Sequence, residues 1–386
     1  MTFMLIAGEA SGDLLAAELV RALRSRSDGL APRFFGAGRQ EMAAAGVELA
    51  VDMTAFGVVG FSDVVKRFLP IRQAFQRLLV LAIERQPDVI IGVDYGGFNL
   101  RFAAAVRWHL AAHRGVFNNW QPKLVQFVSP QVWASRAGRA WQMERDLNLL
   151  LSIFPFEKAW YAQRVPKLRV EFVGHPIYDR YPKAQSGAIP SALRPPPSAP
   201  TLLLLPGSRA GEIKRHLPVM LAALKLLRAK LPELRVEIVL PNGELLAQAK
   251  ALGLPAEVFA SIGGLAEALS RATVALASTG TVTVECAFFG VPTVTLYKTS
   301  WSTYEIGRRL VKVKSLTMPN LLAGEEVFPE FIQNAALPEN LAKAALPLLT
   351  DDTRRAEVAA KLAQIVGTLG TPGATRRAAQ AIMALR

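Results

Sequence analysis

The sequence predicts an α/β protein built from two doubly wound parallel sheets, and three observations lead to this fold class. Short apolar runs alternate with helix-length amphipathic segments along most of the 386 residues. The runs are continuous, as in parallel strands covered on both faces. A stretch rich in proline and small residues, 183–200, interrupts the alternation. We therefore expect a first domain over 1–182, a linker over 183–200, a second domain over 201–335 and a helical C-terminal segment over 336–386.

The predicted strands follow one another in chain order, four in each domain. They are Thr2–Ala7, Asp88–Val93, Lys123–Val128, Leu147–Ser152, Thr201–Leu205, Arg235–Leu240, Thr273–Ala277 and Pro292–Tyr297. Helical patterns lie between them; for example, Leu15, Leu19 and Leu23 share one helical face. Ligands of such sheets bind beyond the carboxyl ends of the strands, and here also in the cleft between the two halves. The turns after the strands are therefore the places to look for functional residues.

Composition and charge exclude several classes of protein. The chain is 51% hydrophobic with a mean hydropathy of +0.24, yet no stretch approaches the roughly 18 apolar residues of a membrane span. The N-terminus has no basic leader, and the single cysteine, Cys286, excludes an internal disulfide. We therefore expect a cytoplasmic protein.

The net charge of +14 is concentrated between residues 101 and 250, where 22 Lys and Arg stand against 9 Asp and Glu. A basic region can face nucleic acid, an anionic bilayer or a phosphorylated substrate. Nucleic acid is the weakest of the three because RNP patterns, zinc fingers and basic tails are absent, and ordinary solubility charge remains an alternative. The apolar segment Phe56–Leu69, which includes Lys66 and Arg67, predicts contact with an anionic bilayer unless it is a buried helix.

The first strand leads into Gly8-Glu9-Ala10-Ser11-Gly12-Asp13 and then a helix. Two glycines at such a turn let the backbone approach a ligand closely, and the helix start offers free N–H groups. The acidic residues argue against a diphosphate at this turn. Glu9, Ser11 and Asp13 are better suited to sugar hydroxyls, with a simple capped helix start as the alternative.

The second domain offers two turns suited to phosphate. Its first strand leads into Pro206-Gly207-Ser208-Arg209, where Arg209 provides a permanently charged bidentate fork next to Ser208. A later strand leads into Ser278, Thr279, Gly280 and Thr281, whose hydroxyl and N–H groups at a helix start can hold a diphosphate. Glu285, one turn into that helix, can accept both ribose hydroxyls or simply complement the helix dipole.

Six motifs, in this order and spanning residues 8–323, resemble the lipid-A-disaccharide synthase family. They are Gly8-Glu9-Ala10-Ser11-Gly12-Asp13, Ser129-Pro130-Gln131-Val132-Trp133-Ala134, Phe154-Pro155-Phe156-Glu157, Gly174-His175-Pro176, Pro206-Gly207-Ser208-Arg209 with Gly211-Glu212-Ile213, and Leu316-Thr317-Met318-Pro319-Asn320-Leu321-Leu322-Ala323. Each motif alone is weak, but six in register are specific.

The resemblance implies a GT-B glycosyltransferase, with the acceptor mostly on the first domain and the UDP-sugar mostly on the second. It implies that UDP-2,3-diacylglucosamine is joined to 2,3-diacylglucosamine 1-phosphate in a β-1,6 linkage with inversion, releasing UDP, and that the enzyme is peripherally associated with the inner membrane. No cofactor is expected, and a homodimer is left open. Two other readings remain: another GT-B activity on UDP-GlcNAc, such as a 2-epimerase or a soluble-acceptor transferase, or a non-catalytic binding protein that keeps the scaffold.

An inverting transfer needs a base for the acceptor hydroxyl, and Asp94, at the end of Asp88–Val93, is the leading candidate, followed by Asp13 and Glu9. In many members of the family this stretch reads Asp-Ala-Pro-Asp-Phe-Asn, and the second Asp, a proposed base, is Gly97 here. Without a metal, Arg209 and the turn Ser278–Thr281 would stabilise the departing diphosphate.

Three further residues are kept as substrate-binding candidates. They are Asp88, at the start of its strand, His175, in the Gly-His-Pro turn, and Asn320, in the last motif. Asp88 is a weak candidate, and His175 either touches the donor or only fixes its turn. The spacing of His109 and His113 does not indicate a metal site, because no Glu separates them as in H-E-x-x-H.

Overall fold

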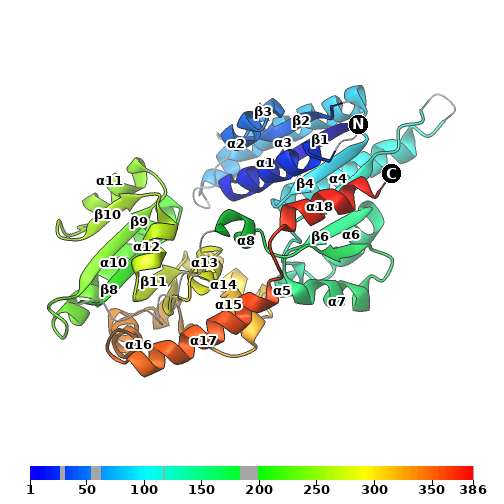
Figure 1. Ribbon diagram of the computed structural model, residues 1–386. Helices are drawn as coiled ribbons and strands as arrows, with labels where there is room; N and C mark the ends of the chain where they lie inside the picture. Colours follow the sequence, from blue (N-terminus) through cyan, green and yellow to red (C-terminus); the bar gives the residue numbers. More distant parts are fainter. Residues whose placement is uncertain (27–30, 54–61, 116–117, 183–198, 386) are drawn as a thin grey trace. The chain divides into compact units, whose positions relative to one another are not determined.

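The structure is a computed structural model that describes residues 1–26, 31–53, 62–115, 118–182 and 199–385. The chain divides into two compact units: residues 1–180 with 369–386 form the first, and residues 181–368 form the second (Figure 1). Residues 183–198 of the predicted linker lie outside the described residues.

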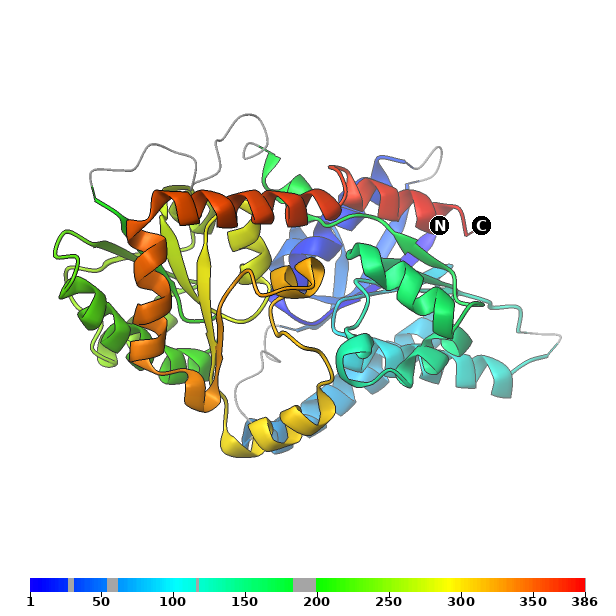
Figure 2. The same ribbon diagram turned by 90° about the horizontal axis from the view of Figure 1, so that it is seen from below.

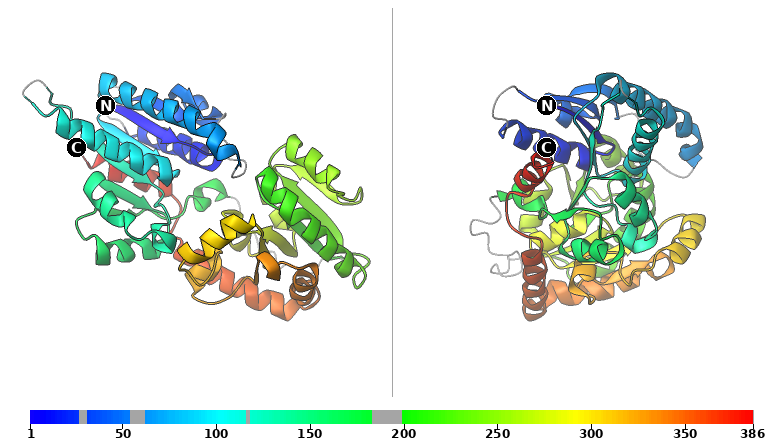
Figure 3. Two further views of the ribbon diagram at one scale, coloured as in Figure 1. Left: turned by 180° about the vertical axis from the view of Figure 1, so that it is seen from behind. Right: turned by 90° about the vertical axis from the view of Figure 1, so that its right-hand side faces the viewer.

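The first unit is built around a seven-stranded parallel sheet with the order β3-β2-β1-β4-β5-β6-β7. Its strands are β1 (Thr2–Ala7), β2 (Arg33–Gly38), β3 (Glu48–Asp52), β4 (Val89–Val93), β5 (Lys123–Phe127), β6 (Leu149–Ser152) and β7 (Val170–Phe172). Its helices are α1 (Ala10–Arg24), α2 (Gln40–Ala44), α3 (Ser62–Arg85), α4 (Gly96–Ala112), α5 (Val132–Ser135), α6 (Arg139–Asp146), α7 (Pro155–Arg164), α8 (Ile177–Arg180) and α18 (Ala374–Met383). The closing helix α18 packs against α1 (Figures 1 and 3), so the end of the chain belongs to the first unit.

The second unit repeats this plan with a six-stranded parallel sheet of order β10-β9-β8-β11-β12-β13. Its strands are β8 (Thr201–Leu205), β9 (Arg235–Leu240), β10 (Phe259–Ile262), β11 (Val274–Ser278), β12 (Thr293–Tyr297) and β13 (Glu330–Ile332). Its helices are α10 (Ala210–Arg228), α11 (Gly243–Ala251), α12 (Leu265–Arg271), α13 (Val282–Phe288), α14 (Trp301–Leu310), α15 (Met318–Ala323), α16 (Pro338–Thr350) and α17 (Asp352–Thr368). α16 packs against α10, and α17 packs against α13 and α15 (Figure 2).

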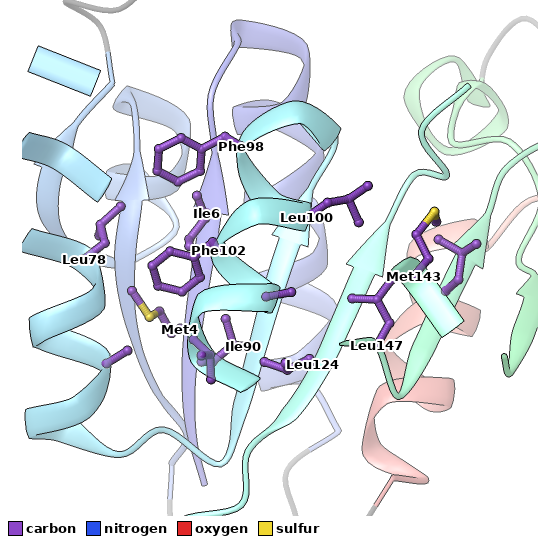
Figure 4. Packing of buried hydrophobic residues seen from close by; sticks show 14 of the residues in the cluster. Met4, Ile6, Leu78, Ile90, Phe98, Leu100, Phe102, Leu124, Met143 and Leu147 are labelled. Atoms are coloured by element: carbon purple, nitrogen blue, oxygen red, sulfur yellow. The ribbon is translucent and has the colours of Figure 1, made fainter. Parts of the chain in front are cut away.

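Both faces of each central strand are buried, which explains the continuous apolar runs in the sequence. Leu202 and Leu204 of β8 belong to the core shared with α10 and α16. Their neighbours Leu203 and Leu205 belong to a second core shared with α12, α13 and α17. In the first unit, Phe98 and Phe102 of α4 and Leu78 of α3 cover Met4 and Ile6 of β1 (Figure 4).

The predicted fold class is confirmed, with two parallel-sheet α/β units and helices to the end of the chain. Within the described residues, no helix combines the length and the apolar character needed to cross a bilayer. Of the apolar segment 56–69, residues 56–61 and the side chains of 62–68 lie outside the description, and Leu69 is 63% exposed.

Candidate active site

The strand order of the first sheet reverses at β1 and β4. The chain winds outward from β1 in both directions, and ligands of doubly wound sheets bind at this reversal of strand order. Ala7, the last residue of β1, pairs with Val93, the last residue of β4. The two strands therefore end at the same level, and the turns that carry Glu9 and Asp94 leave the sheet side by side.

The turn after β4 has an unusual backbone. Asp94 and Tyr95 have φ values of +50° and +41°, a left-handed conformation that residues other than glycine rarely adopt. Hydrogen bonds fix it: the Asp94 N–H donates to the Phe127 carbonyl at 2.8 Å, and the Asp94 carbonyl accepts from Asn99 Nδ2 at 2.9 Å and Gln126 Nε2 at 2.8 Å. The direction of the Asp94 side chain is thus set by buried groups of β5 and α4.

Glycines allow these turns to approach each other. A Cβ atom at Gly8 would lie 2.5 Å from the Tyr95 ring, and one at Gly92 would lie 2.6 Å from Gln126 Oε1. Either substitution would displace the groups that hold the Asp94 turn. Gly97 differs, since it is exposed and a Cβ there would meet no atom within 4 Å, which leaves open space beside the turn.

The environment of Asp94 favours its neutral form. Burial raises the pKa of Asp94, the negative charge of Glu9 raises it further, and a hydrogen bond from the Tyr95 backbone acts in the opposite direction. Burial and Glu9 also raise the pKa of the Tyr95 hydroxyl. A half-buried carboxyl group with a raised pKa, at the carboxyl end of an inner strand, is suited to accepting a proton.

The other acidic residue of the glycine turn, Asp13, is engaged within the protein. Its side chain is 2% exposed; Oδ1 accepts from the Arg39 N–H at 2.6 Å and Oδ2 accepts from the Glu41 N–H at 2.9 Å. Asp13 therefore stabilises the start of α2. Ser11 lies exposed in the first turn of α1, on the same glycine turn as Glu9.

Two substrate-binding candidates of the first unit have structural partners away from Asp94. Asp88 precedes the opposite, amino end of β4, where its Oδ2 accepts from the Thr2 N–H at 2.7 Å. The structure therefore separates Asp88 from Asp94 by the length of the strand. His175 Nδ1 accepts from the Ile177 N–H at 3.2 Å, and burial with the nearby charge of Arg180 lowers its pKa to about 3. A neutral His175 fixes the turn after β7.

A buried polar cluster that the sequence did not predict lies after β5 and β6. The Trp133 Nε1–H donates to Glu157 Oε1 at 3.1 Å, and Ser129 Oγ lies 2.9 Å from the Tyr161 hydroxyl. Burial raises the pKa of Glu157 to about 7, although hydrogen bonds from Trp133 and Ser129 act in the opposite direction. The signal was present, because three of these residues lie in motifs that carry the family resemblance.

In the second sheet the corresponding reversal lies between β8 and β11, and both predicted phosphate turns follow these strands. Glu212 holds the first turn: its Oε2 accepts from the Ser208 N–H at 3.0 Å, and its Oε1 lies 3.4 Å from Arg209 Nη1. Gly207 is required because its φ of +126° is strained for any other residue and a Cβ there would lie 2.7 Å from Glu212 Cβ. The Arg209 side chain remains 46% exposed at the start of α10.

The second turn runs from Ser278, buried at the end of β11, through Thr279 and Gly280 to the exposed Thr281. The Gly280 carbonyl accepts from Thr283 Oγ1 at 2.7 Å, and a Cβ at Gly280 would meet no atom within 4 Å. The structure thus brings the predicted residues 208, 209 and 278–281 together at the carboxyl ends of the neighbouring strands β8 and β11 of the second sheet.

Glu285, the predicted ribose ligand, lies in α13 directly after this turn. Its Oε1 accepts from the Tyr181 hydroxyl at 2.9 Å. The Tyr181 ring also packs edge-on against Phe289 of the same unit, with ring centroids 5.2 Å apart. Glu285 therefore has a structural partner that a ribose would have to share or replace.

Asn320 has a structural role that its motif did not predict. Its Nδ2 donates to the Phe328 carbonyl and to Glu330 Oε1, and its Oδ1 accepts from the N–H groups of Val327 and Phe328, all at 2.8 Å. Both amide hydrogens and both oxygen lone pairs are used, so Asn320 retains no hydrogen-bonding capacity for a substrate. A substrate would have to replace one of these partners, and the role of Asn320 as a substrate ligand stays a prediction.

A second missed residue, His216 of α10, joins the ends of two strands in the second sheet. Its Nδ1 lies 2.8 Å from the Pro206 carbonyl, and its Nε2 accepts from the Lys298 N–H at 3.0 Å. Burial lowers the pKa of this completely buried ring. Neutral His216 therefore fixes the Arg209 turn against the end of β12.

Among the described residues, no group of three or more His, Cys, Asp or Glu side chains is placed to hold a metal ion. His109 and His113 stack on each other with ring centroids 4.1 Å apart, and His113 Nδ1 lies 3.0 Å from the His109 carbonyl.

Comparison with known proteins gives concordant results. The sequence profile of the family described as lipid-A-disaccharide synthetase matches residues 3–385. A lipid-A-disaccharide synthase from Myxococcus xanthus is 36% identical over 387 residues, covering 99% of this chain and 97% of the relative. A lipid-A-disaccharide synthase from Nitrosococcus oceani is also 36% identical, covering 99% of this chain and 95% of the relative.

Solved structures support the fold. The UDP-GlcNAc 2-epimerase from Neisseria meningitidis bound to UDP-GlcNAc matches with a TM-score of 0.58 at 12% identity over 100% of both chains. The glycotransferase of kitacinnamycin matches with a TM-score of 0.60 at 18% identity over 99% of this chain and 98% of that one. At such identities the likeness shows the fold alone, and it confirms the GT-B fold that the resemblance implies.

Proposed function

The chain belongs to the lipid-A-disaccharide synthase family, and from this premise we propose the reaction it catalyses and the residues that carry it. The chain is a GT-B glycosyltransferase of lipid A disaccharide synthesis. In the proposed reaction, the 6-hydroxyl of 2,3-diacylglucosamine 1-phosphate attacks the anomeric carbon of UDP-2,3-diacylglucosamine from the face opposite UDP. The bond between this carbon and the diphosphate oxygen breaks, so the product is a β-1,6 disaccharide 1-phosphate plus UDP.

One observation carries the proposed base: the turns with Glu9 and Asp94 follow neighbouring strands that end at the same level, and the charge of Glu9 raises the pKa of Asp94. Asp94 accepts the proton of the acceptor hydroxyl, and its raised pKa supports this role because it lies closer to neutral pH than that of an ordinary Asp. The charge of Glu9 keeps that pKa raised.

The donor is assigned to the second unit. Arg209 neutralises the diphosphate as negative charge develops on it, and its planar fork can contact two phosphate oxygens at once. Ser208 and the turn 278–281 add hydroxyl and N–H groups at the same sheet edge. Glu212 and His216 position this edge without themselves contacting the donor. No cofactor enters the proposal, since UDP leaves as a product and Arg209 carries the charge stabilisation.

Acylated substrates reside in a bilayer, so we place the enzyme on the cytoplasmic surface of the inner membrane, with its net charge of +14 favouring anionic lipid. The resemblance leaves a homodimer open, and sedimentation of the purified protein would decide this.

Mass spectrometry of products from the purified protein with both acylated substrates tests the function. We expect one disaccharide 1-phosphate and one UDP per turnover. Formation of UDP-ManNAc from UDP-GlcNAc would instead indicate a 2-epimerase, and transfer to a water-soluble acceptor would indicate a different GT-B transferase. Failure to release UDP with any of these substrates would leave a non-catalytic binding protein.

A further inference from the structure

Helix α14 lies at the same edge of the second sheet as the proposed donor turns. It follows the carboxyl end of β12 through Lys298–Ser300, and Ser300 begins the helix by accepting from the Thr303 N–H at 3.3 Å. His216 ties the Lys298 backbone to the Pro206 turn. Figure 2 shows α14 (yellow) at the margin of its unit.

The segment 301–314 carries an excess of positive charge. Arg308, Arg309, Lys312 and Lys314 are all exposed, and Glu305 is its single acidic residue. Glu305 Oε2 lies 2.8 Å from Arg308 Nη2 and 3.8 Å from Arg309 Nη2, so one carboxylate serves two guanidinium groups. A net positive charge therefore remains on this surface.

Large apolar side chains are exposed on the same segment. Trp301 is 75% exposed, Leu310 42% and Val311 36%. Basic residues combined with an exposed Trp and aliphatic side chains are typical of helices that lie in the headgroup region of a membrane. A nucleic acid would use the charge but would gain little from Leu310 and Val311.

We propose that Trp301–Lys314, here called the α14 segment, docks on an anionic lipid bilayer and holds the donor edge of the second sheet at the membrane surface. The α14 segment is distinct from the apolar segment 56–69, and the inference rests on the proposed function because acylated substrates require an enzyme at the bilayer. Trp301 enters the headgroup region, and the four basic side chains contact lipid phosphates.

The test measures binding of the full-length protein to vesicles of phosphatidylglycerol and phosphatidylethanolamine by co-sedimentation. One variant replaces the four basic residues of the α14 segment with Gln. Its matched control replaces four exposed lysines elsewhere in the second unit with Gln, so both variants lose the same charge; these lysines are Lys225, Lys230, Lys250 and Lys343. Each basic side chain near an anionic surface contributes about a fivefold factor, so full engagement of all four predicts about 600-fold weaker binding for the first variant. Engagement of only two would still predict about 25-fold, and we expect about threefold or less for the control.

Trp301→Ser provides an independent variant, expected to weaken vesicle binding about tenfold while the circular dichroism spectrum is retained. Fluorescence quenching by lipids brominated in the acyl chain should decrease in Trp301→Phe. Equal binding of the first variant and its control would overturn the inference. It would also be overturned by binding to uncharged phosphatidylcholine that is equally strong, by preferential binding of duplex DNA, or by a dimer in solution that Trp301→Ser dissociates.

Turnover in detergent micelles separates this inference from the proposed function. We expect the four-Gln variant to keep its kcat in micelles within about twofold, because none of its changes touches the proposed catalytic residues. A wild-type protein that makes no disaccharide in micelles would refute the proposed function, while the vesicle measurements would still decide the role of the α14 segment.

Discussion

Replacing Asp94 with Asn tests the proposed base with little disturbance of the fold. The hydrogen bonds that fix the turn involve the Asp94 backbone and the side chains of Asn99 and Gln126, so the substitution leaves them in place. Asn also tolerates the left-handed conformation better than most residues. We therefore expect Asp94→Asn to fold normally and to bind UDP with unchanged affinity in calorimetry.

The expected loss is in turnover. Positioned general bases contribute about 100- to 10,000-fold, so kcat of Asp94→Asn should fall by a factor in this range while the KM for the donor changes little. Replacing Glu9 with Gln has a different effect, because it removes the negative charge that raises the pKa of Asp94 and leaves the burial that also raises it. The acidic limb of the pH profile of kcat/KM should therefore move to lower pH in Glu9→Gln, without disappearing.

The assay follows UDP release in detergent micelles between about pH 4 and 9. Gly97→Asp is the control, since position 97 has space for a side chain and in many relatives carries an acid according to the family resemblance. We expect it to change kcat by less than about threefold. If Asp94→Asn stays active while Glu9→Gln or Asp13→Asn is inactive, the base lies in the first glycine turn and the assignment is wrong. A gain of more than about tenfold in Gly97→Asp would also contradict it.

Three further changes test the surroundings of the site. Arg209→Ala should lower kcat/KM by about 100-fold or more with poor rescue by Lys, whereas Arg228→Ala, on the same helix but in an exposed ion pair with Glu257, should not. Because burial raises the pKa of Glu157 from 4.5 to about 7, the unfolded chain releases this proton first, and the free energy of unfolding should fall by up to about 3 kcal/mol as the pH rises through this window. Glu157→Gln should remove that component in urea titrations at pH 5 and pH 8. His216→Ala leaves two backbone groups without their partner and should lower the free energy of unfolding by about 2–4 kcal/mol in the same assay.

The sequence predicted the central strands and missed the outer ones for a physical reason. β3, β7, β10 and β13 are the edge strands of the two sheets, and one side of each has no strand partner among the residues that the structure describes. Short edge strands such as Glu330–Ile332 need no long apolar run. β2 lies inside its sheet, but its sequence contains two glycines, and a Cβ at Gly36 would lie 1.9 Å from the Leu5 carbonyl oxygen. Because the backbones of β1 and β2 approach closely at Gly36, a glycine is needed there, and it interrupts the apolar run by which a buried strand is recognised in a sequence.

For the candidate site, the sequence predicted which turns follow the carboxyl ends of neighbouring strands, but not which atoms each side chain contacts. A turn after a parallel strand is a candidate site wherever it occurs, so Glu9, Asp94 and Arg209 could be found in this way. Asp13 and Asn320 belong to equally plausible motifs, yet their polar atoms bond to backbone groups distant in sequence or across a loop. His216 shows the converse, because its function depends on two strand ends that come together only in the folded chain.

The two glycines after Asp94 illustrate the limit most clearly. In Asp94-Tyr95-Gly96-Gly97, the simplest expectation places positive φ values at the glycines. In the structure Asp94 and Tyr95 have the positive values, while Gly96 and Gly97 begin α4. Gly96 is needed for another reason, since a Cβ there would lie 2.6 Å from the Pro130 ring. The backbone strain therefore falls on Asp94, whose pKa is raised and which follows β4, where the strand order reverses. Such strain persists where the surrounding structure holds a side chain in place for function.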